Sequence, residues 1–513
     1  MTDRADTAKG KKIALYGLGA LLLLVLWSTA SFLAGSYIIP SPFHTAVELI
    51  SLLSQGYAWT QILISFLRVV AGFTLALVAG LSVGIASGIN RDIETLFRPL
   101  VLIAQGTPPL LWIIPLILVL GIGHLSPITV IALICFPTVA LNVNEGVKTV
   151  PVELKQMLDL FAPGAYPRVR ELLLPHLKPF LAASVRLGIV LGIKASVIAE
   201  YFGANNGIGF QVQAAFHSLQ VRKLFAWGVI FILLILITGW LLGKLEKALA
   251  HPGKQQQRAL TSLLAPRIGG KLTRATPKPS EREQLVLRDV SFAYPGAQLL
   301  LDRIDLTVRQ EEIVVISGDS GVGKTTLLYA AAGLLQPVSG TVMRPERIGF
   351  IFQDERFLPW RSNLWNVALP LIYAGIPPAV ALGQARRLFA EAGLSGWEQA
   401  APAELSGGMK KRLAFARCFA RLPDALLLDE PFSGLDAGGR QCLWRKFITL
   451  LDVHHGPVLI VTHFPEEIPS SDRCRFFTLA PSRAGVKRPN RLIPCHSLLT
   501  LTFASNTHTL GGT

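Results

Sequence analysis

The chain has 513 residues, of which 51% are hydrophobic and only 16% are charged, with a mean hydropathy of +0.47 and a net charge of +16. This length allows two or three domains, each with its own core. A composition this apolar excludes a purely soluble enzyme and indicates that part of the chain lies in a membrane.

The positive charge is concentrated in and beside the apolar half of the chain. Residues 1–250 carry a net +7, residues 251–280 add +6 with no acidic residue, and the remainder adds only +3. This distribution favours a positive-inside membrane orientation and contact with the lipid membrane, with no nucleic acid as partner. The five cysteines show no CxxC or CxxH spacing, so we expect neither a disulfide framework nor a zinc site.

Apolar runs predict an all-α membrane domain over residues 1–250. About six transmembrane helices are expected, at residues 13–34, 69–88, 100–122, 127–141, 179–199 and 225–243. The first run follows three lysines, and we interpret it as an uncleaved helix rather than a signal peptide because of its length. With a cytoplasmic N-terminus, the inside loops hold most basic residues, whereas the outside loop 35–61 has none.

The composition changes twice after the last apolar run. Residues 251–283 are basic and rich in Pro, Gly and Gln, which predicts a flexible linker near the inner leaflet. From residue 284 to 480, short β-like runs alternate with helical stretches, as in an α/β domain. Residues 481–513 form a C-terminal tail of unassigned role.

The segment "VVISGDSGVGKTTLL" carries the strongest motif. An apolar strand precedes Gly-x-x-x-x-Gly-Lys-Thr, and a helical pattern follows it. The glycines let backbone N–H groups surround a phosphate, Lys324 adds charge at the outer phosphates, and Thr325 can ligate Mg²⁺. The candidate nucleotide-binding residues here are Gly318, Asp319, Ser320, Gly321, Val322, Gly323, Lys324, Thr325 and Thr326.

Two further segments point to the same chemistry. In "ALLLDEP", an apolar strand ends in Asp429, which can hold Mg²⁺ through water, and Glu430, which can orient or deprotonate the attacking water. In "ELSGGMKKR", Ser406 and the N–H groups of Gly407 and Gly408 precede a helix and form a candidate anion site.

In their order and spacing, these segments and "SGLD" resemble the ATP-binding cassette of ABC transporters. The resemblance covers about 200 residues and implies an α/β P-loop NTPase fold with ATP and Mg²⁺ bound. It also implies a sandwich of two cassettes, in which Ser406, Gly407, Gly408 and Asp436 contact ATP in trans. By the same resemblance Tyr294 stacks on adenine, Gln353 senses Mg²⁺, and His463 reaches the γ-phosphate. Met409 and Phe464 depart from the commoner Gln and Asp.

The membrane half resembles the permeases of nitrate/sulfonate/taurine-type importers. The segments "PSPFHTAVEL", "QGTPPLLWIIPLILVLGIG", "LLLPHLKPFLAASVRLGI" and "VIAEYFGANNGIGFQVQAA" carry this resemblance, which makes the chain a natural fusion of permease and ATPase. It implies ATP-driven import of a small anion into a bacterium across the cytoplasmic (inner) membrane, with the ATPase in the cytoplasm. A homodimer and a separate periplasmic solute-binding protein are the implied partners, and loop 147–178 is the implied coupling element.

Two questions stay open at this level. Lys194 and Glu200 lie in one apolar run but about 240° apart around the helix, so they cannot pair with each other, and a role in anion passage is one hypothesis for Lys194. For the whole chain, an exporter half-transporter, a related importer of a thiamine precursor and a non-transporting membrane ATPase are the alternatives to the anion importer.

Overall fold

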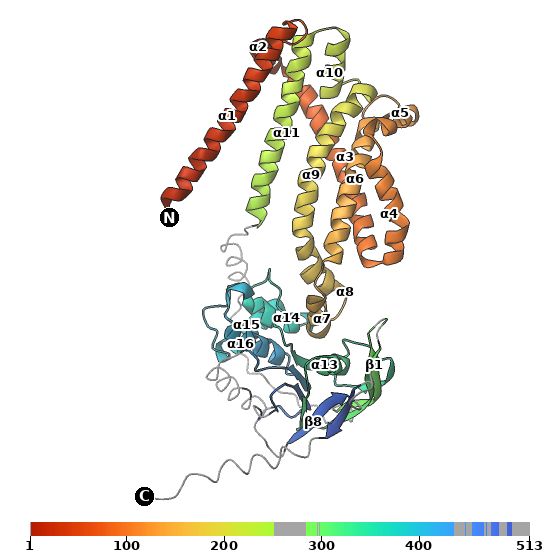
Figure 1. Cartoon of the computed structure of the whole chain (residues 1–513), viewed down its shortest axis with the longest axis vertical. Helices are drawn as coiled ribbons and strands as arrows, with labels where there is room; N and C mark the ends of the chain where they lie inside the picture. The colour runs from red at the N-terminus through yellow and green to blue at the C-terminus, as the bar shows by residue number, and fades with distance from the viewer. Residues whose placement is uncertain are drawn as a thin grey trace, which may run out of the picture. The chain divides into compact units, whose positions relative to one another are not determined.

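The computed structural model describes residues 2–250, 284–294, 296, 298–434, 447, 454–465, 468, 473–481 and 490–494. It contains two compact units, Met1–Val150 with His176–Pro252 and Pro151–Pro175 with Gly253–Thr513 (Figure 1). We call them the helical unit and the α/β unit, and each is described by itself. The predicted linker 251–283 and Asp436 lie outside the described residues.

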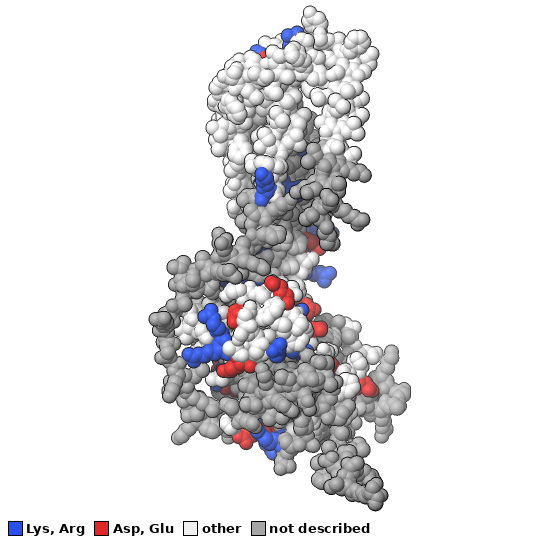
Figure 2. Space-filling model, turned by 90° about the vertical axis from the view of Figure 1, so that its left-hand side faces the viewer, with Lys and Arg blue, Asp and Glu red and all other residues white. Residues whose placement is uncertain are grey.

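The helical unit consists of long apolar helices joined by short connections. Its surface in Figure 2 is almost free of charged side chains away from its ends. Among the described residues, α1, α3, α6, α9 and α11 are long and apolar enough to cross a membrane. The helices are α1 (Thr2–Ala34), α2 (Pro42–Leu53), α3 (Gly56–Ile89), α4 (Arg91–Gly106), α5 (Pro109–Leu120), α6 (Leu125–Lys148), α9 (Leu174–Gly203), α10 (Ile208–His217) and α11 (Val221–Ala250).

The run 100–122, predicted as one transmembrane helix, is a bent pair in the structure. Helices α4 and α5 meet at an angle of 99° and count as a sixth span only if taken together. The break lies at Thr107 and Pro108, directly before Pro109. Proline lacks a backbone N–H and disfavours helical geometry in the residue before it, so two adjacent prolines end α4 there.

Helices α3 and α6 pack closely because α3 has glycines on the face toward α6. A Cβ atom added at Gly80 or Gly84 would lie 2.6 Å or 2.8 Å from the Cβ atoms of Val139 and Val143, respectively. Spacing of four residues keeps such glycines on one side of the helix. Small residues on one face let the backbones of two membrane helices come close together. The resulting van der Waals contacts hold the helices together, because the hydrophobic effect does not drive helix association in lipid.

A buried polar cluster joins α3, α9 and the start of α10. Glu200 is completely buried and pairs with Arg68 at 3.0 Å. Its carboxylate also accepts hydrogen bonds from Ser65 at 2.7 Å and from the Gly209 N–H at 3.0 Å. Arg68 was not among the residues predicted from sequence, although a charge buried among apolar helices requires such a partner. Lys194, by contrast, is exposed on α9.

The described residues of the α/β unit form a nine-stranded sheet. The parallel strands β8, β3, β7, β6 and β5 make up one side of it as far as the edge at β5, and the antiparallel strands β1, β2 and β4 form the other edge. The spatial order is β4-β1-β2-β9-β8-β3-β7-β6-β5. The strands are β1 (Leu285–Ala293), β2 (Leu299–Val308), β3 (Ile313–Ser317), β4 (Ser339–Met343), β5 (Ile348–Ile351), β6 (Ala425–Asp429), β7 (Val458–Val461), β8 (Cys474–Pro481) and β9 (Asn490–Pro494). Strand β9 therefore extends the sheet into the segment expected to be a tail.

Helices cover this sheet and form a second apolar core beside it. The central strands β6 and β7 are buried along their whole length, as expected for parallel strands covered on both faces. A separate core joins α14, α15 and α16 through residues such as Leu364, Phe389 and Leu413. The helices of this unit are α7 (Val152–Phe161), α8 (Ala165–Pro167), the π-helical turn η1 (Arg168–Leu173), α13 (Lys324–Ala332), α14 (Asn363–Tyr373), α15 (Pro378–Glu391), η2 (Pro402–Glu404) and α16 (Gly407–Phe419).

Candidate functional site

Four of the predicted motifs follow four neighbouring parallel strands. The P-loop, residues 318–325, comes after β3, His463 after β7, Glu430 after β6 and Gln353 after β5. Parallel strands place their carboxyl ends at one edge of the sheet, and ligands of such sheets bind in the crevice outside that edge. The topology therefore collects residues that are up to 145 positions apart (Gly318 to His463) at one site.

The P-loop is a backbone cradle whose shape depends on its glycines. Gly323 has φ +98°, which favours glycine, and N-caps α13. Gly318 has φ +149°, and a Cβ there would lie 2.5 Å from the Leu479 carbonyl oxygen. The Lys324 Nζ donates to the carbonyls of Gly318 and Asp319 at 2.7 and 2.8 Å, which holds the ammonium at the loop. Burial lowers the pKa of Lys324, and the nearby carboxylates of Glu430 and Asp429 oppose this shift.

Tyr294, the candidate adenine-stacking residue, lies beside the first turn of α13. Its hydroxyl is 3.1 Å from the Thr326 hydroxyl, and its ring is half-exposed. The ring also packs edge-on against Phe292 of β1. An anchored aromatic ring with an exposed face can accept a stacked base.

Glu430 and His463 meet directly at the end of β6 and β7. The His463 Nε2 lies 3.2 Å from the Glu430 Oε1, and the Lys324 Nζ lies 3.5 Å from the same imidazole. Glu430 has φ +45°, a left-handed conformation that is costly for a residue other than glycine. Backbone strain of this kind is concentrated at functional sites, so it supports the candidate role of Glu430.

Asp429 is fully buried at the tip of β6. Neither carboxylate oxygen makes a hydrogen bond of normal geometry within the described residues. Burial raises the pKa of Asp429 to about 6, while the neighbouring Thr325 hydroxyl opposes the rise. A buried acid with unsatisfied oxygens fits a divalent cation nearby, because a cation would supply the missing charge. The described residues contain no group of three or more His, Cys, Asp or Glu that could hold a metal.

Lys411, which was not among the residues predicted from sequence, contacts three of the motifs. This buried side chain on α16 donates to the carbonyl of Gln353 at 3.1 Å and approaches that of Glu430 at 3.5 Å. It also pairs with Glu355 at 3.3 Å. Its position five residues after Ser406 was visible in "LSGGMKK", but nothing in the sequence shows which lysine points inward.

The candidate trans residues lie apart from the P-loop contacts described above. Ser406 N-caps α16, and its hydroxyl accepts from the Met409 N–H at 3.4 Å. Ser406 and Gly407 are exposed. Within the part of the chain that the structure describes, no hydrogen bond joins these residues to the P-loop.

The segment expected to couple the two domains forms helices within the α/β unit. Glu171 in η1 is completely buried, and both its carboxylate oxygens accept hydrogen bonds from Arg361, at 2.8 and 3.0 Å. Tyr373 donates to the same carboxylate at 2.8 Å, and the Trp360 indole donates to the Glu171 carbonyl. Burial and the Glu171 carboxylate raise the pKa of Tyr373. A buried carboxylate with this many partners is a strong attachment point.

A second contact lies between this segment and the P-loop helix. Arg356, three residues after Gln353, donates to the Gln156 side chain at 2.8 Å and to the Tyr329 hydroxyl in α13 at 2.6 Å. The buried Arg417 lies over the rings of Phe161 and Phe357 at 4.6 and 4.7 Å. These arginines were not recognised from sequence because the partners named here lie at least 27 residues away along the chain.

Comparisons with known proteins agree with both units. The family model described as "Binding-protein-dependent transport system inner membrane component" matches residues 72–251, and the model "ABC transporter" matches residues 301–433. The aliphatic sulfonates import ATP-binding protein SsuB 3 of Paraburkholderia xenovorans is 47% identical over 173 residues, which cover 34% of this chain and 68% of that protein. An SsuB 2 of Streptomyces avermitilis is 42% identical over 197 residues, covering 38% and 75%.

A solved structure of the dimeric cassette MJ0796 is 27% identical, with a TM-score of 0.35, and covers 38% of this chain and 93% of that one. With both family models matched and its cassette relatives covered over two thirds of their length, the chain belongs to the ABC transporters. It combines a permease of the importer type with a cassette that binds and hydrolyses ATP to drive transport, on one membrane-associated polypeptide.

Proposed function

We propose that this protein imports a small anion of the sulfonate, nitrate or taurine class across the bacterial cytoplasmic membrane. The observation that carries the proposal is the presence, in one chain, of a binding-protein-dependent permease and a cassette whose relatives are named for aliphatic sulfonate import. A separate periplasmic binding protein delivers the solute, because the resemblance lies with importers that depend on one. The exporter half-transporter is disfavoured by the permease match, and a thiamine precursor remains the alternative solute.

An anionic solute also agrees with the charges of the helical unit. Lys194 is an exposed cation in the middle of the apolar helix α9, and it forms no ion pair among the described residues. An unpaired charge at this depth is costly in lipid and is therefore expected to face a polar path. In a homodimer, this face of α9 would line the route of the anion.

At the ATP site, we assign the chemical work to Glu430. Its carboxylate accepts the proton of the attacking water or orients that water, while His463 positions the Glu430 carboxylate and the γ-phosphate. Lys324 and the N–H groups of Gly318 to Thr326 hold the phosphates. Thr325, Gln353 and, through water, Asp429 would hold Mg²⁺, which supplies charge neutralisation at the phosphates.

Coupling follows from the buried contacts of residues 151–175. In this proposal, Glu171 and Gln156 fix the coupling segment to Arg361 and Arg356, which follow Gln353. Arg356 also donates a hydrogen bond to Tyr329 of α13. The Arg356 side chain therefore connects the helix after the P-loop with the coupling segment, and a displacement of one can shift the other. Because packed contacts shift between discrete arrangements, such a chain can transmit closure of the ATP site.

The proposal is tested in proteoliposomes that contain the purified chain and enclose ATP. Adding a candidate periplasmic binding protein loaded with a sulfonate should raise ATP hydrolysis and accumulate labelled sulfonate inside. Repeating the assay with the binding protein loaded with nitrate or with a thiamine precursor tests which solute is transported. Accumulation without any binding protein, or net export of a solute, would contradict the proposal.

A further inference from the structure

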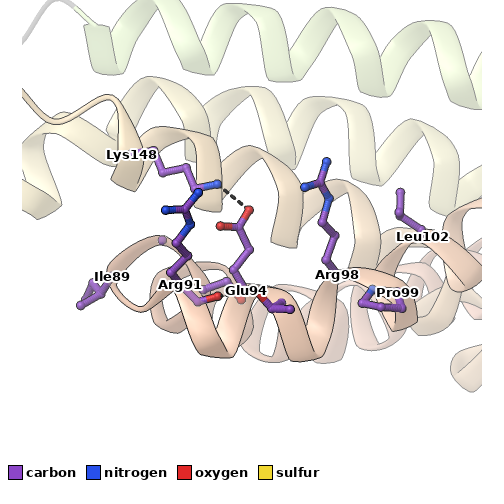
Figure 3. Close-up of a pocket in the computed structure, with 10 residues that line it drawn as sticks. Ile89, Arg91, Glu94, Arg98, Pro99, Leu102 and Lys148 are labelled. Carbon is purple, nitrogen blue, oxygen red and sulfur yellow. Dashed lines mark hydrogen bonds and ion pairs between the residues drawn. The ribbon is translucent and has the colours of Figure 1, made fainter. Parts of the chain in front are cut away.

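A cavity of about 810 Å³ opens on the helical unit at the ends of α3 and α6 (Figure 3). Arg91, Glu94 and Arg98 of α4 and Lys148 of α6 line it. Arg91 and Arg98 are seven residues apart, which places them on one face of α4, about 10 Å apart along its axis. In Figure 3 both arginines extend toward the side from which Lys148 approaches.

The charges in this cavity do not balance. Lys148 forms an ion pair with Glu94, so these two groups neutralise each other. Arg91 and Arg98 are exposed, and neither forms an ion pair with any carboxylate of the described residues. Two guanidinium groups therefore face one open space, which suits an anionic oxygen group because guanidinium binds phosphate through two parallel hydrogen bonds.

Apolar side chains lie beside the charged ones in this cavity, which distinguishes it from a site for a free ion. Ile89 and Leu102 line it and are 70% and 51% exposed, and Leu96 and Leu100 expose the adjoining surface of α4. Contact with exposed leucine and isoleucine side chains would not stabilise a bound soluble anion. A molecule with a charged head and hydrocarbon chains would contact both parts, as amphipathic helices do at membrane surfaces.

We propose that this cavity binds the headgroup of an anionic phospholipid of the cytoplasmic leaflet, with its phosphate held by Arg91 and Arg98 and its acyl chains along Ile89, Leu102 and the apolar face of α4. The lipid site rests on the proposed import function only through the membrane orientation that the basic residues predict, and it needs neither the solute nor ATP turnover. A zwitterionic lipid carries no net charge to balance the two arginines, so binding should select for anionic lipid.

The test is native mass spectrometry of the full chain in detergent, without nucleotide, solute or binding protein. Phosphatidylglycerol and phosphatidylcholine with the same acyl chains are titrated against the wild type and against Arg91→Gln/Arg98→Gln. The matched control is Arg222→Gln/Lys223→Gln, which removes two exposed basic residues at the start of α11. Soluble glycerol phosphate is added as a competitor, to distinguish a lipid site from a site for any phosphate.

We expect the double arginine variant to bind phosphatidylglycerol roughly 30-fold more weakly than the wild type, with the control variant unchanged. Glu94→Gln releases Lys148 from its ion pair and should therefore strengthen the binding of phosphatidylglycerol, whereas the arginine variant weakens it. Equal binding of phosphatidylglycerol by the arginine variant, equal binding of phosphatidylcholine by the wild type, or full competition by glycerol phosphate at the lipid concentration would each overturn the proposal. Because no step involves transport, these outcomes are independent of whether the solute is an anion.

Discussion

At the scale of single residues, the ATP site places strained and unsatisfied groups at the end of one strand. Asp429 is buried with oxygens that lack normal hydrogen bonds, and Glu430 next to it has a left-handed backbone. Lys411 and Ser433 stabilise this turn through the Glu430 carbonyl, at 3.5 and 2.9 Å. Arrangements that cost folding free energy persist where the surrounding contacts enforce them and function requires them.

Glu430→Gln should preserve ATP binding but lower the rate of ATP hydrolysis by at least about 10². The amide occupies the same space beside His463 but cannot accept the proton of the attacking water. Lys324→Ala should instead weaken ATP binding, because the ammonium at the P-loop is lost. Nucleotide affinity and single-turnover hydrolysis of the purified proteins separate the two effects. Near-normal turnover in Glu430→Gln would rule out its assigned role.

Asp429→Asn should make the nucleotide-free protein more stable at pH 7.5. The pKa of Asp429 is raised by burial from 3.8 to about 6, so the unfolded state releases this proton at lower pH than the folded state. The free energy of unfolding of the wild type therefore falls as pH rises from about 4 to 6. At pH 7.5 the full cost of the buried charged carboxylate, on the order of 3 kcal/mol, is present in the folded state. The neutral amide avoids this cost.

Melting temperatures of both proteins at pH 7.5 and pH 5 provide the measurement. The advantage of Asp429→Asn should narrow at pH 5, where folded wild-type protein keeps the proton. Adding ATP with Mg²⁺ should stabilise the wild type more than the variant, since the carboxylate then faces a cation. A variant that is less stable than the wild type at both pH values would contradict the assigned origin of the pKa shift.

At the scale of elements, the segment 151–175 belongs by its contacts to the α/β unit. Its helix α7 buries Met157 and Leu158 completely, and η1 buries Glu171. The prediction of a coupling loop rested on the resemblance and on "LLLP", whose Pro175 ends this segment. What the sequence did not reveal is the pairing of Glu171 with Arg361, because the two residues are separated by 190 positions.

Glu171→Leu should reduce transport more than ATP binding and should lower the melting temperature. It leaves Arg361 and Tyr373 without their carboxylate, and removing one partner of a buried pair costs about 3–5 kcal/mol. The double variant Glu171→Leu/Arg361→Met replaces both charges by apolar groups and should recover most of the stability. The ratio of solute transported to ATP hydrolysed reports on coupling separately from folding.

Asp159→Asn is the control, because Asp159 lies in α7 and forms a partly exposed ion pair with Arg168. Exposed ion pairs contribute little to stability, so this variant should have the transport rate and the melting temperature of the wild type. If Asp159→Asn and Glu171→Leu had equal effects on coupling, the buried contact would have no special role.

At the scale of the whole molecule, one chain supplies one P-loop and one LSGG segment. Ser406 and Gly407 are exposed, which leaves them accessible to a second copy. Two copies give two permease parts and two cassettes, and closed twofold symmetry is the commonest arrangement of identical subunits. We therefore predict a homodimer in which each ATP site combines Lys324 of one copy with Ser406 of its partner.

A mixed dimer of a Lys324→Ala chain and a Ser406→Arg chain tests this arrangement. If the sites form in trans, one site carries both defects and the other is intact. If each site forms within one chain, no intact site exists in any combination. Vanadate trapping of nucleotide in the purified mixed dimer should therefore exceed trapping in either single-variant homodimer. No excess, with dimer formation verified, would reject sites shared between two copies of this chain.

The class of both halves could be assigned from the amino-acid sequence alone. Apolar runs of about 20 residues have few structural solutions other than membrane helices, and the P-loop, LSGG and "LLLDEP" segments are local patterns whose chemistry depends on near neighbours. The run that contains α4 and α5 was predicted as a single helix, although Pro108 and Pro109 mark the position of the break in the sequence.

The pairing of charged side chains, by contrast, could be seen only in the folded protein. Arg68 with Glu200, Arg361 with Glu171, and Lys411 with the Gln353 carbonyl are separated by 132, 190 and 58 positions. Local periodicity indicates which face of a helix is apolar, but the partner of a buried charge is set by the packing of distant elements. The same packing decides that Arg91 and Arg98 share one cavity with Lys148, because α4 returns alongside the end of α6.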